Sequence, residues 1–111
     1  MRIYISGKIT GLSKSEAWYN FGQANRKLHS KGHDVVDPIS IGEHIPGLDW
    51  KSYMTIAYGI IHDPSVNAIY MLKNWPDSPG AVIEWSWAQA RGLPVLYEDP
   101  AHYEKYERRM Q

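Results

Sequence analysis

Glu84 is the residue of this sequence best placed to do chemistry, because it follows a loop that joins a buried strand to the start of a helix. Residues 67–72 are predicted to form the strand. Residues 81–91 have helical composition and stop at Gly92, a residue type favoured just beyond a helix. Ser78 is a natural N-cap. Free amides and the helix dipole attract anionic ligands to such a helix start, so Glu84, about one and a half turns further on, is expected to face a ligand site.

A second candidate loop follows the first predicted strand. Residues 2–6 are a short apolar run, and Gly7 and Gly11 enclose the loop that comes after it. Glycine-bounded loops let backbone amides approach a ligand closely. Lys8 adds a positive charge to this loop. We therefore expect the loop to take part in function.

Strands alternate with helices along the chain, and this order is typical of an α/β fold. A capping box at Ser13 and Glu16 opens a helix that Gly32 closes. The other expected elements are a strand over 34–37, a loop over 39–49 that could close over a site, a helix over 50–61 and a strand over 93–97. The prediction is a three-layer, flavodoxin/Rossmann-like parallel sheet of four to five strands, with helices on both faces and right-handed crossovers.

Length and charge limit the classes of partner. At 111 residues the chain is expected to form one domain over 1–98, followed by a charged helix or tail over 99–111. Twelve basic residues balance twelve acidic ones, which favours a small-molecule partner over polymeric nucleic acid or a membrane surface. We expect a cytoplasmic protein, because the sequence lacks a long apolar span and a signal-peptide pattern.

Cofactor and metal chemistry have no signature in the sequence. There is no cysteine, which excludes disulfides and thiolate nucleophiles, and the five histidines lack the spacing of metal ligands. His29 and His33 are four residues apart, but Gly32 stops the helix between them. No P-loop, nicotinamide fingerprint or serine-hydrolase elbow occurs. We therefore expect no cofactor and no metal.

Three separated segments together resemble the nucleoside deoxyribosyltransferase superfamily. They are residues 4–11 (YISGKITG), residues 67–72 (NAIYML) and residues 75–84, which contain a Ser-x-Gly-Ala-x-x-Glu core. The resemblance covers about residues 2–98. It is greatest to a small uncharacterised bacterial and phage branch, whose first loop also resembles that of deoxynucleoside 5′-monophosphate N-glycosidases.

The resemblance implies a reaction. In this superfamily the motif glutamate attacks the anomeric carbon of a deoxyribonucleoside, expels the base and forms a covalent intermediate that water or a second base resolves. Glu84 matches that nucleophile, and a carboxylate suits an oxocarbenium-like transition state. Tyr4 matches a tyrosine that orients the nucleophile, although a strand tyrosine in the core would look the same. The implied substrate-binding residues are Gly7, Lys8, Ile9, Thr10, Gly11, Ser78 and Gly80.

The role of Ser78 has two interpretations. It matches the serine that holds the 5′-phosphate in the monophosphate-specific relatives, and it could equally be a helix cap alone. The two interpretations are compatible with each other, because a serine that caps a helix lies beside its anion-binding N-terminus.

The sequence departs from the superfamily at two aspartates. Ala57 and Asn67 stand where relatives carry acidic residues that orient the sugar or protonate the base. Asp63, Asp77 or Asp37 could substitute for them. The leading hypothesis is an N-glycosidase or deoxyribosyltransferase acting on a deoxyribonucleoside or its 5′-monophosphate. The alternative is a catalytically inactive nucleotide-binding module that sequesters a nucleotide or a nucleotide-derived signal.

Relatives form dimers or larger assemblies whose neighbouring subunits complete each active site. Five Trp and eight Tyr are many for so short a chain, and we attribute them to core packing and a subunit interface. Exposed aromatic residues such as Trp85 or Trp87 could form that interface. The resemblance therefore implies a homodimer or higher homo-oligomer.

Overall fold

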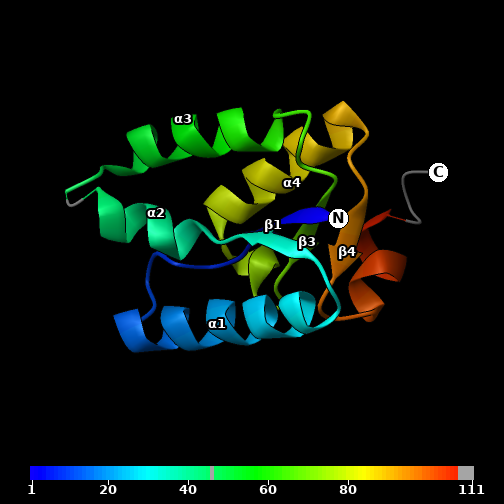
Figure 1. Cartoon of the computed structure of the whole chain (residues 1–111), viewed down its shortest axis with the longest axis horizontal. Helices are drawn as coiled ribbons and strands as arrows, with labels where there is room; N and C mark the ends of the chain where they lie inside the picture. The colour runs from blue at the N-terminus through cyan, green and yellow to red at the C-terminus, as the bar shows by residue number, and fades with distance from the viewer. Residues whose placement is uncertain (46, 108–111) are drawn as a thin grey trace.

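The computed structural model describes residues 1–45 and 47–107. It alternates strands and helices along the chain (Figure 1). In chain order the main elements are β1 (Arg2–Ser6), α1 (Lys14–Ser30), β2 (Asp34–Val36), α2 (Pro38–His44), α3 (Trp50–Ile61), β3 (Ala68–Met71), α4 (Pro79–Arg91) and β4 (Val95–Tyr97). A 3₁₀ turn, Trp75–Asp77, joins β3 to α4, and a π-helical turn, Tyr103–Glu107, follows β4.

The four strands form one parallel sheet in the order β2-β1-β3-β4. The chain moves one way from β1 to β2 through α1, and the opposite way from β2 to β4 through α3 and α4. Crossover connections of the same handedness that run in opposite directions place their helices on opposite faces of the sheet. Accordingly, α1 lies on one face, and α3 and α4 lie on the other, as Figure 1 shows. The predicted α/β class, with a parallel sheet and helices on both faces, is confirmed.

Alternate residues of β1 supply the two halves of the core. Ile3 and Ile5 pack with Phe21 of α1 on one face of the sheet. Tyr4 packs with residues of α3 and α4 on the other face, and Ser6 follows Tyr4 at the strand's period of two. Tyr4 and Ser6 are both fully buried. The strand therefore places two hydroxyl groups beneath α4.

The predicted helix ends agree with the structure. Ser13 accepts a hydrogen bond from the Glu16 amide and donates one to the Glu16 carboxylate at the start of α1. Ser78 caps α4, and Gly92 ends it with a positive φ of 76°. These are local interactions between residues close in sequence, so their sequence patterns are informative.

The prediction of a loop over 39–49 is wrong for its first half, which is helix α2. Asp37 is the cause, because its carboxylate accepts a hydrogen bond from the Ile39 amide and so caps a helix that Pro38 opens. The strand expected over 34–37 consequently ends at Val36.

The aromatic residues of α4 are less exposed than expected. Trp85 is half-buried, stacks on Trp75 and donates its indole N–H to the Tyr97 hydroxyl, and Trp87 is also half-buried. The large exposed side chains near this helix are instead those of Trp50, Tyr58 and Val82.

The segment after β4 packs back onto the domain. The indole N–H of Trp75 donates to Nδ1 of His102 at 3.2 Å, and the ring of Tyr106 meets that of Trp75 edge-on. Of the predicted charged helix or tail, the described part through Glu107 therefore includes helical turns that cover Trp75. Residues 108–111 lie outside the described part.

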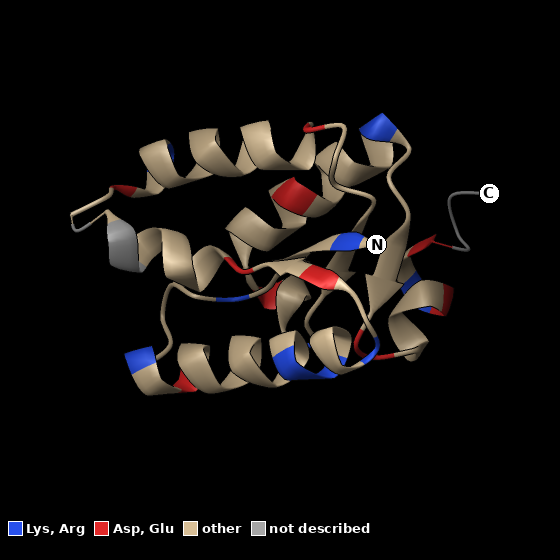
Figure 2. Cartoon of the chain, in the orientation of Figure 1, with Lys and Arg blue, Asp and Glu red and all other residues tan. Residues whose placement is uncertain are grey.

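Charged residues are unevenly placed along the ribbon (Figure 2). Lys51 is the only charged residue of α3, and Glu84 and Arg91 are the only ones of α4. None of the described helices has both the length and the hydropathy of a membrane-spanning segment.

Gly7 is required by the close approach of β1 to the end of β3. A Cβ atom at position 7 would lie 2.6 Å from Cδ1 and 2.9 Å from Cβ of the buried Leu72 side chain. We predict that Gly7→Ala lowers the free energy of unfolding by about 1–3 kcal/mol, because the added methyl group overpacks the core. Urea denaturation monitored by tryptophan fluorescence measures the change.

Gly59→Ala is the matched control. A Cβ at this exposed position of α3 meets no atom within 4 Å. Replacing a helical glycine by alanine should therefore stabilise the protein by about 0.5–1 kcal/mol. Equal stability changes in the two variants would contradict the steric explanation for Gly7.

Candidate functional site

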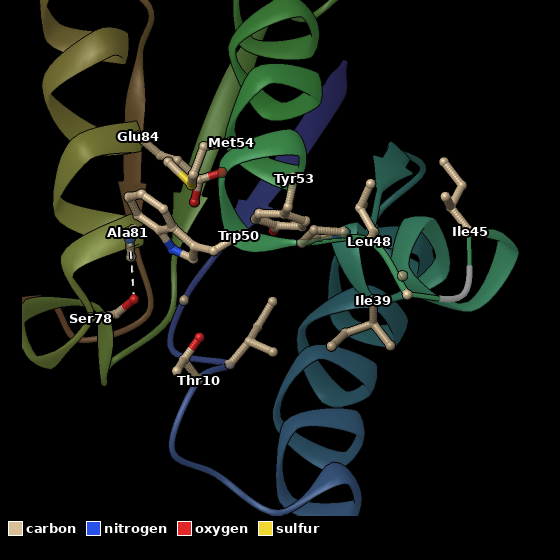
Figure 3. A pocket seen from close by; sticks show the side chains of 16 residues that line it. Thr10, Ile39, Ile45, Leu48, Trp50, Tyr53, Met54, Ser78, Ala81 and Glu84 are labelled. Atoms are coloured by element: carbon tan, nitrogen blue, oxygen red, sulfur yellow. Dashed lines mark hydrogen bonds between the residues drawn. The ribbon is translucent and has the colours of Figure 1, made fainter.

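A cavity of about 340 Å³ lies where β1 and β3 end and α4 begins. The direction of the chain reverses between these two strands, which is the usual place for a ligand site in a parallel sheet. Figure 3 shows side chains from the β1–α1 loop, α2, α3 and α4 pointing into it. The lining residues are Gly7, Ile9, Thr10, Pro38, Ile39, Gly42, Ile45, Gly47, Leu48, Trp50, Tyr53, Met54, Ser78, Gly80, Ala81 and Glu84.

Glu84 lies in the wall of this cavity and is almost completely buried, with 2% of its surface exposed. Both of its carboxylate oxygens accept hydrogen bonds from β1. The Tyr4 hydroxyl donates to Oε2, and the Ser6 hydroxyl donates to Oε1 at 2.7 Å. A buried carboxyl needs such partners, because an unpaired charge in an apolar environment is strongly unfavourable. The arrangement fixes the orientation of the carboxyl group.

Burial raises the pKa of Glu84 from its ordinary 4.5 to about 7, while the hydrogen bonds from Tyr4 and Ser6 oppose this rise. Burial, followed by the nearby Glu84 charge, raises the pKa of Tyr4 well above its usual value. Tyr4 therefore stays protonated and remains a hydrogen-bond donor when Glu84 ionises. At neutral pH this carboxyl group can act as a nucleophile or as a base.

Ser6 and Tyr53 are site residues that the sequence reasoning missed. Ser6 could have been found, because it follows Tyr4 at the strand period and must point to the same face. Tyr53 lies on α3 and lines the cavity together with Glu84. Its contact joins residues far apart in sequence, so no local pattern reveals it.

The structure gathers most of the predicted substrate-binding residues around the cavity. Gly7, Ile9 and Thr10 line it from the first loop, and Ser78 and Gly80 line it from the start of α4. The Ser78 hydroxyl accepts a hydrogen bond from the Ala81 amide, so it also caps the helix.

Lys8 and Gly11 are not among the lining residues. The Lys8 backbone amide donates to Oδ1 of Asn74 at 3.0 Å, which ties the first loop to the loop after β3. Gly11 has a φ of 89°, a value that glycine adopts readily and that turns the chain toward α1.

The three aspartates considered as substitutes for the missing acidic residues do not line the cavity. Asp37 caps α2, and Asp63 accepts a hydrogen bond from the Ser65 amide. Asp77 is the last residue of the 3₁₀ turn before α4. Among the lining side chains that the structure describes, Glu84 is the only carboxyl group. Nor do three His, Asp or Glu side chains of the described residues gather closely enough to hold a metal ion.

The raised pKa of Glu84 predicts a pH-dependent stability. Between the ordinary pKa of 4.5 and the folded pKa of about 7, the folded state binds more protons at Glu84 than the unfolded state does. The stabilisation is complete below pH 4.5 and is lost as the pH rises through 7. Relative to Glu84→Gln, which does not titrate, the wild-type free energy of unfolding should fall by roughly 3 kcal/mol over this range.

Urea denaturation of both proteins from pH 4 to pH 8 measures this difference. Parallel stability curves for the wild type and Glu84→Gln would show that Glu84 titrates with an ordinary pKa.

Residues 1–97 match the domain of unknown function DUF4406. No curated protein and no solved structure matches the chain. Because the match extends over β1 to β4 and includes every residue that lines the cavity, the chain belongs to the DUF4406 family.

Proposed function

We propose that this protein cleaves the N-glycosidic bond of a deoxyribonucleoside or its 5′-monophosphate, with Glu84 as the nucleophile. The observation that carries the proposal is the hydrogen bonding of the buried Glu84 carboxyl to Tyr4 and Ser6 in the wall of a cavity. The sequence resemblance to nucleoside deoxyribosyltransferases supports it, since the tyrosine and glutamate that the resemblance pairs are in contact here.

In the proposed reaction, one Glu84 oxygen attacks C1′ of the sugar while the bond from C1′ to the base nitrogen breaks. The electron pair of that bond leaves with the base, and the product is a glycosyl ester of Glu84. Water yields the free sugar, and a second base yields a new nucleoside. Tyr4 and Ser6 hold the carboxyl group in one orientation, which limits the entropy lost on reaching the transition state.

The walls of the cavity suit the two parts of such a substrate. Ile39, Leu48 and Met54 offer an apolar surface for a planar base. The start of α4, with Ser78 and Gly80, lies on the same cavity and suits a sugar hydroxyl or a 5′-phosphate. The small-molecule partner in this proposal is therefore a nucleoside or nucleotide.

Glu84→Gln tests the reaction directly. We predict that release of free base, measured by chromatography after long incubation with each deoxynucleoside and its monophosphate, falls by roughly 10³-fold or more, because an amide is a poor nucleophile. Glu98→Gln is the control, since Glu98 accepts a hydrogen bond from the Lys73 amide and does not line the cavity. Full base release by Glu84→Gln would overturn the proposal.

The alternative proposal is a nucleotide-binding module without turnover. The positions of Asp37, Asp63 and Asp77 favour it, because none of them lines the cavity to protonate a departing base. General acid catalysis contributes about 10²–10⁴-fold to such reactions. A rise in melting temperature with a nucleotide, combined with no base release by the wild type, would support this alternative.

We also propose that the protein is a homodimer that uses the α3/α4 surface, defined here as Trp50, Tyr58, Ile83 and Trp87. Trp50 is 53% exposed and Tyr58 is 50% exposed, and an apolar groove of about 410 Å³ runs between the two helices. Few charges occur on these helices, and an exposed apolar patch of this kind commonly marks an interface. Trp50 also lines the Glu84 cavity, so the interface and the site are adjacent.

Light scattering at micromolar concentration should give twice the mass of one chain. Ile83→Glu places a charge on the α3/α4 surface and should produce a monomer, since burying an unpaired charge is costly. Tyr19→Glu on the exposed side of α1 should leave the mass unchanged. A wild-type mass equal to one chain would contradict the dimer.

A further inference from the structure

We infer that the Glu84 cavity continues into a second subsite on α1, and that this subsite binds a planar aromatic substituent with an acidic end, carried by the base of the substrate. The inference rests on the proposed function for the assignment of the cavity to a nucleoside or nucleotide. It adds the chemical character of the base, which the proposed function does not specify.

An apolar groove of about 300 Å³ lies between the first loop, the start of α1 and the start of α2. Ile9, Ile39 and Gly42 line both this groove and the Glu84 cavity, so the two spaces meet at these residues. Figure 3 shows Ile39 on the same side of the cavity as Thr10 of the first loop. A Cβ atom at Gly42 would meet no described atom within 4 Å beyond its own helix turn. The junction is therefore open at Gly42.

One face of α1 forms the far wall of the groove. Lys14, Ala17 and Trp18 line it, and residues three and four positions apart lie on the same side of a helix. Ala17 is buried and has a small side chain, so it leaves room between the two longer ones. The groove thus presents an aromatic ring and a cation one helical turn apart.

Trp18 favours a flat aromatic ligand group. The residue is 48% exposed, and its side chain makes no ring contact and no hydrogen bond with a described residue. A planar group that stacks on such a ring buries apolar surface of both partners. Ile39 belongs to the wall that suits the base, whereas the start of α4 suits the sugar or phosphate. A group that reaches Trp18 past Ile39 is therefore attached to the base.

Lys14 favours an acidic group at the end of that substituent. It is the only charged side chain among the described residues that line the groove. The only ion pair within the described part of the chain joins His102 and Asp99, so Lys14 has no acidic partner there. Ser13 is already engaged, because its hydroxyl caps α1 together with Glu16. A carboxylate in the groove would supply the partner that Lys14 lacks.

The affinities of three deoxynucleosides test the inference. They are deoxyadenosine and its derivatives with a benzyl or a 4-carboxybenzyl group on the exocyclic amine, and the same series on deoxycytidine covers a pyrimidine. Each is titrated calorimetrically into Glu84→Gln, or into the wild type if it shows no turnover. The benzyl group should raise the affinity about fivefold by stacking on Trp18. The carboxyl group should add about threefold by pairing with Lys14.

Substitutions in the groove assign the two gains to their residues. Trp18→Leu should abolish the gain from the benzyl group, and Trp18→Phe, which keeps an aromatic face, should retain most of it. Lys14→Met should abolish only the gain from the carboxyl group. Tyr19→Leu is the matched control, because Tyr19 is exposed on the same helix and does not line the groove. None of these variants should change the affinity for unsubstituted deoxyadenosine.

Equal affinities for the three ligands would overturn the inference, as would gains that survive Trp18→Leu and Lys14→Met. Base release by the wild type is measured separately, so the two proposals can fail separately. Selective binding without base release would support the subsite and contradict the proposed reaction. Release of base with no effect of the substituents would contradict the subsite alone. Absence of binding by every nucleoside would overturn both.

Discussion

The structure depends on one constraint, which is that the Glu84 carboxyl group is buried and must be hydrogen-bonded there. Taking an ionisable group out of water costs several kcal/mol unless partners replace its hydration. Tyr4 and Ser6 provide those partners from alternate positions of β1. This requires β1 at the centre of the sheet and α4 directly above it, and the strand order β2-β1-β3-β4 satisfies that requirement. The site and the core of the domain are therefore built from the same contacts.

Two opposing effects set the pKa of Glu84. Desolvation favours its neutral form, and the two hydroxyl donors favour its charged form. Desolvation is the larger effect, so the pKa rises to about 7 and the group titrates near neutral pH. A carboxylate with few water molecules around it reacts more readily than a solvated one, because less solvation must be removed before it attacks. Such an environment suits a nucleophile that must also be ionised.

The cavity beside Glu84 is assembled from segments that are distant in sequence. The first loop contributes Gly7 and Thr10, α3 contributes Trp50 and Tyr53, and α4 contributes its first turn. The mostly apolar walls and the buried Glu84 carboxyl group are compatible with the nucleoside or nucleotide that we propose as the ligand. Membership of the DUF4406 family carries no assigned activity, so the proposed glycosidic chemistry is argued from these residues and from the resemblance of the sequence.

Local sequence patterns were sufficient to predict the α/β class, the limits of α3 and α4, and the position of Glu84 in a helix that begins beside a strand end. These features follow from short-range effects, since Ser78 and Gly92 act on backbone groups within a few residues. The Asp37 cap is equally local, but Gly42, Pro46 and Gly47 favour a loop in the sequence, so the prediction did not include α2. The burial of Glu84, its hydrogen bond with Ser6, the position of Tyr53 in the cavity lining and that of Lys8 outside it follow from the tertiary structure alone. Burial and side-chain contacts depend on how α3 and α4 pack across β1. The residues that meet in this packing are about 50 to 80 positions apart, so no local sequence pattern predicts their contacts.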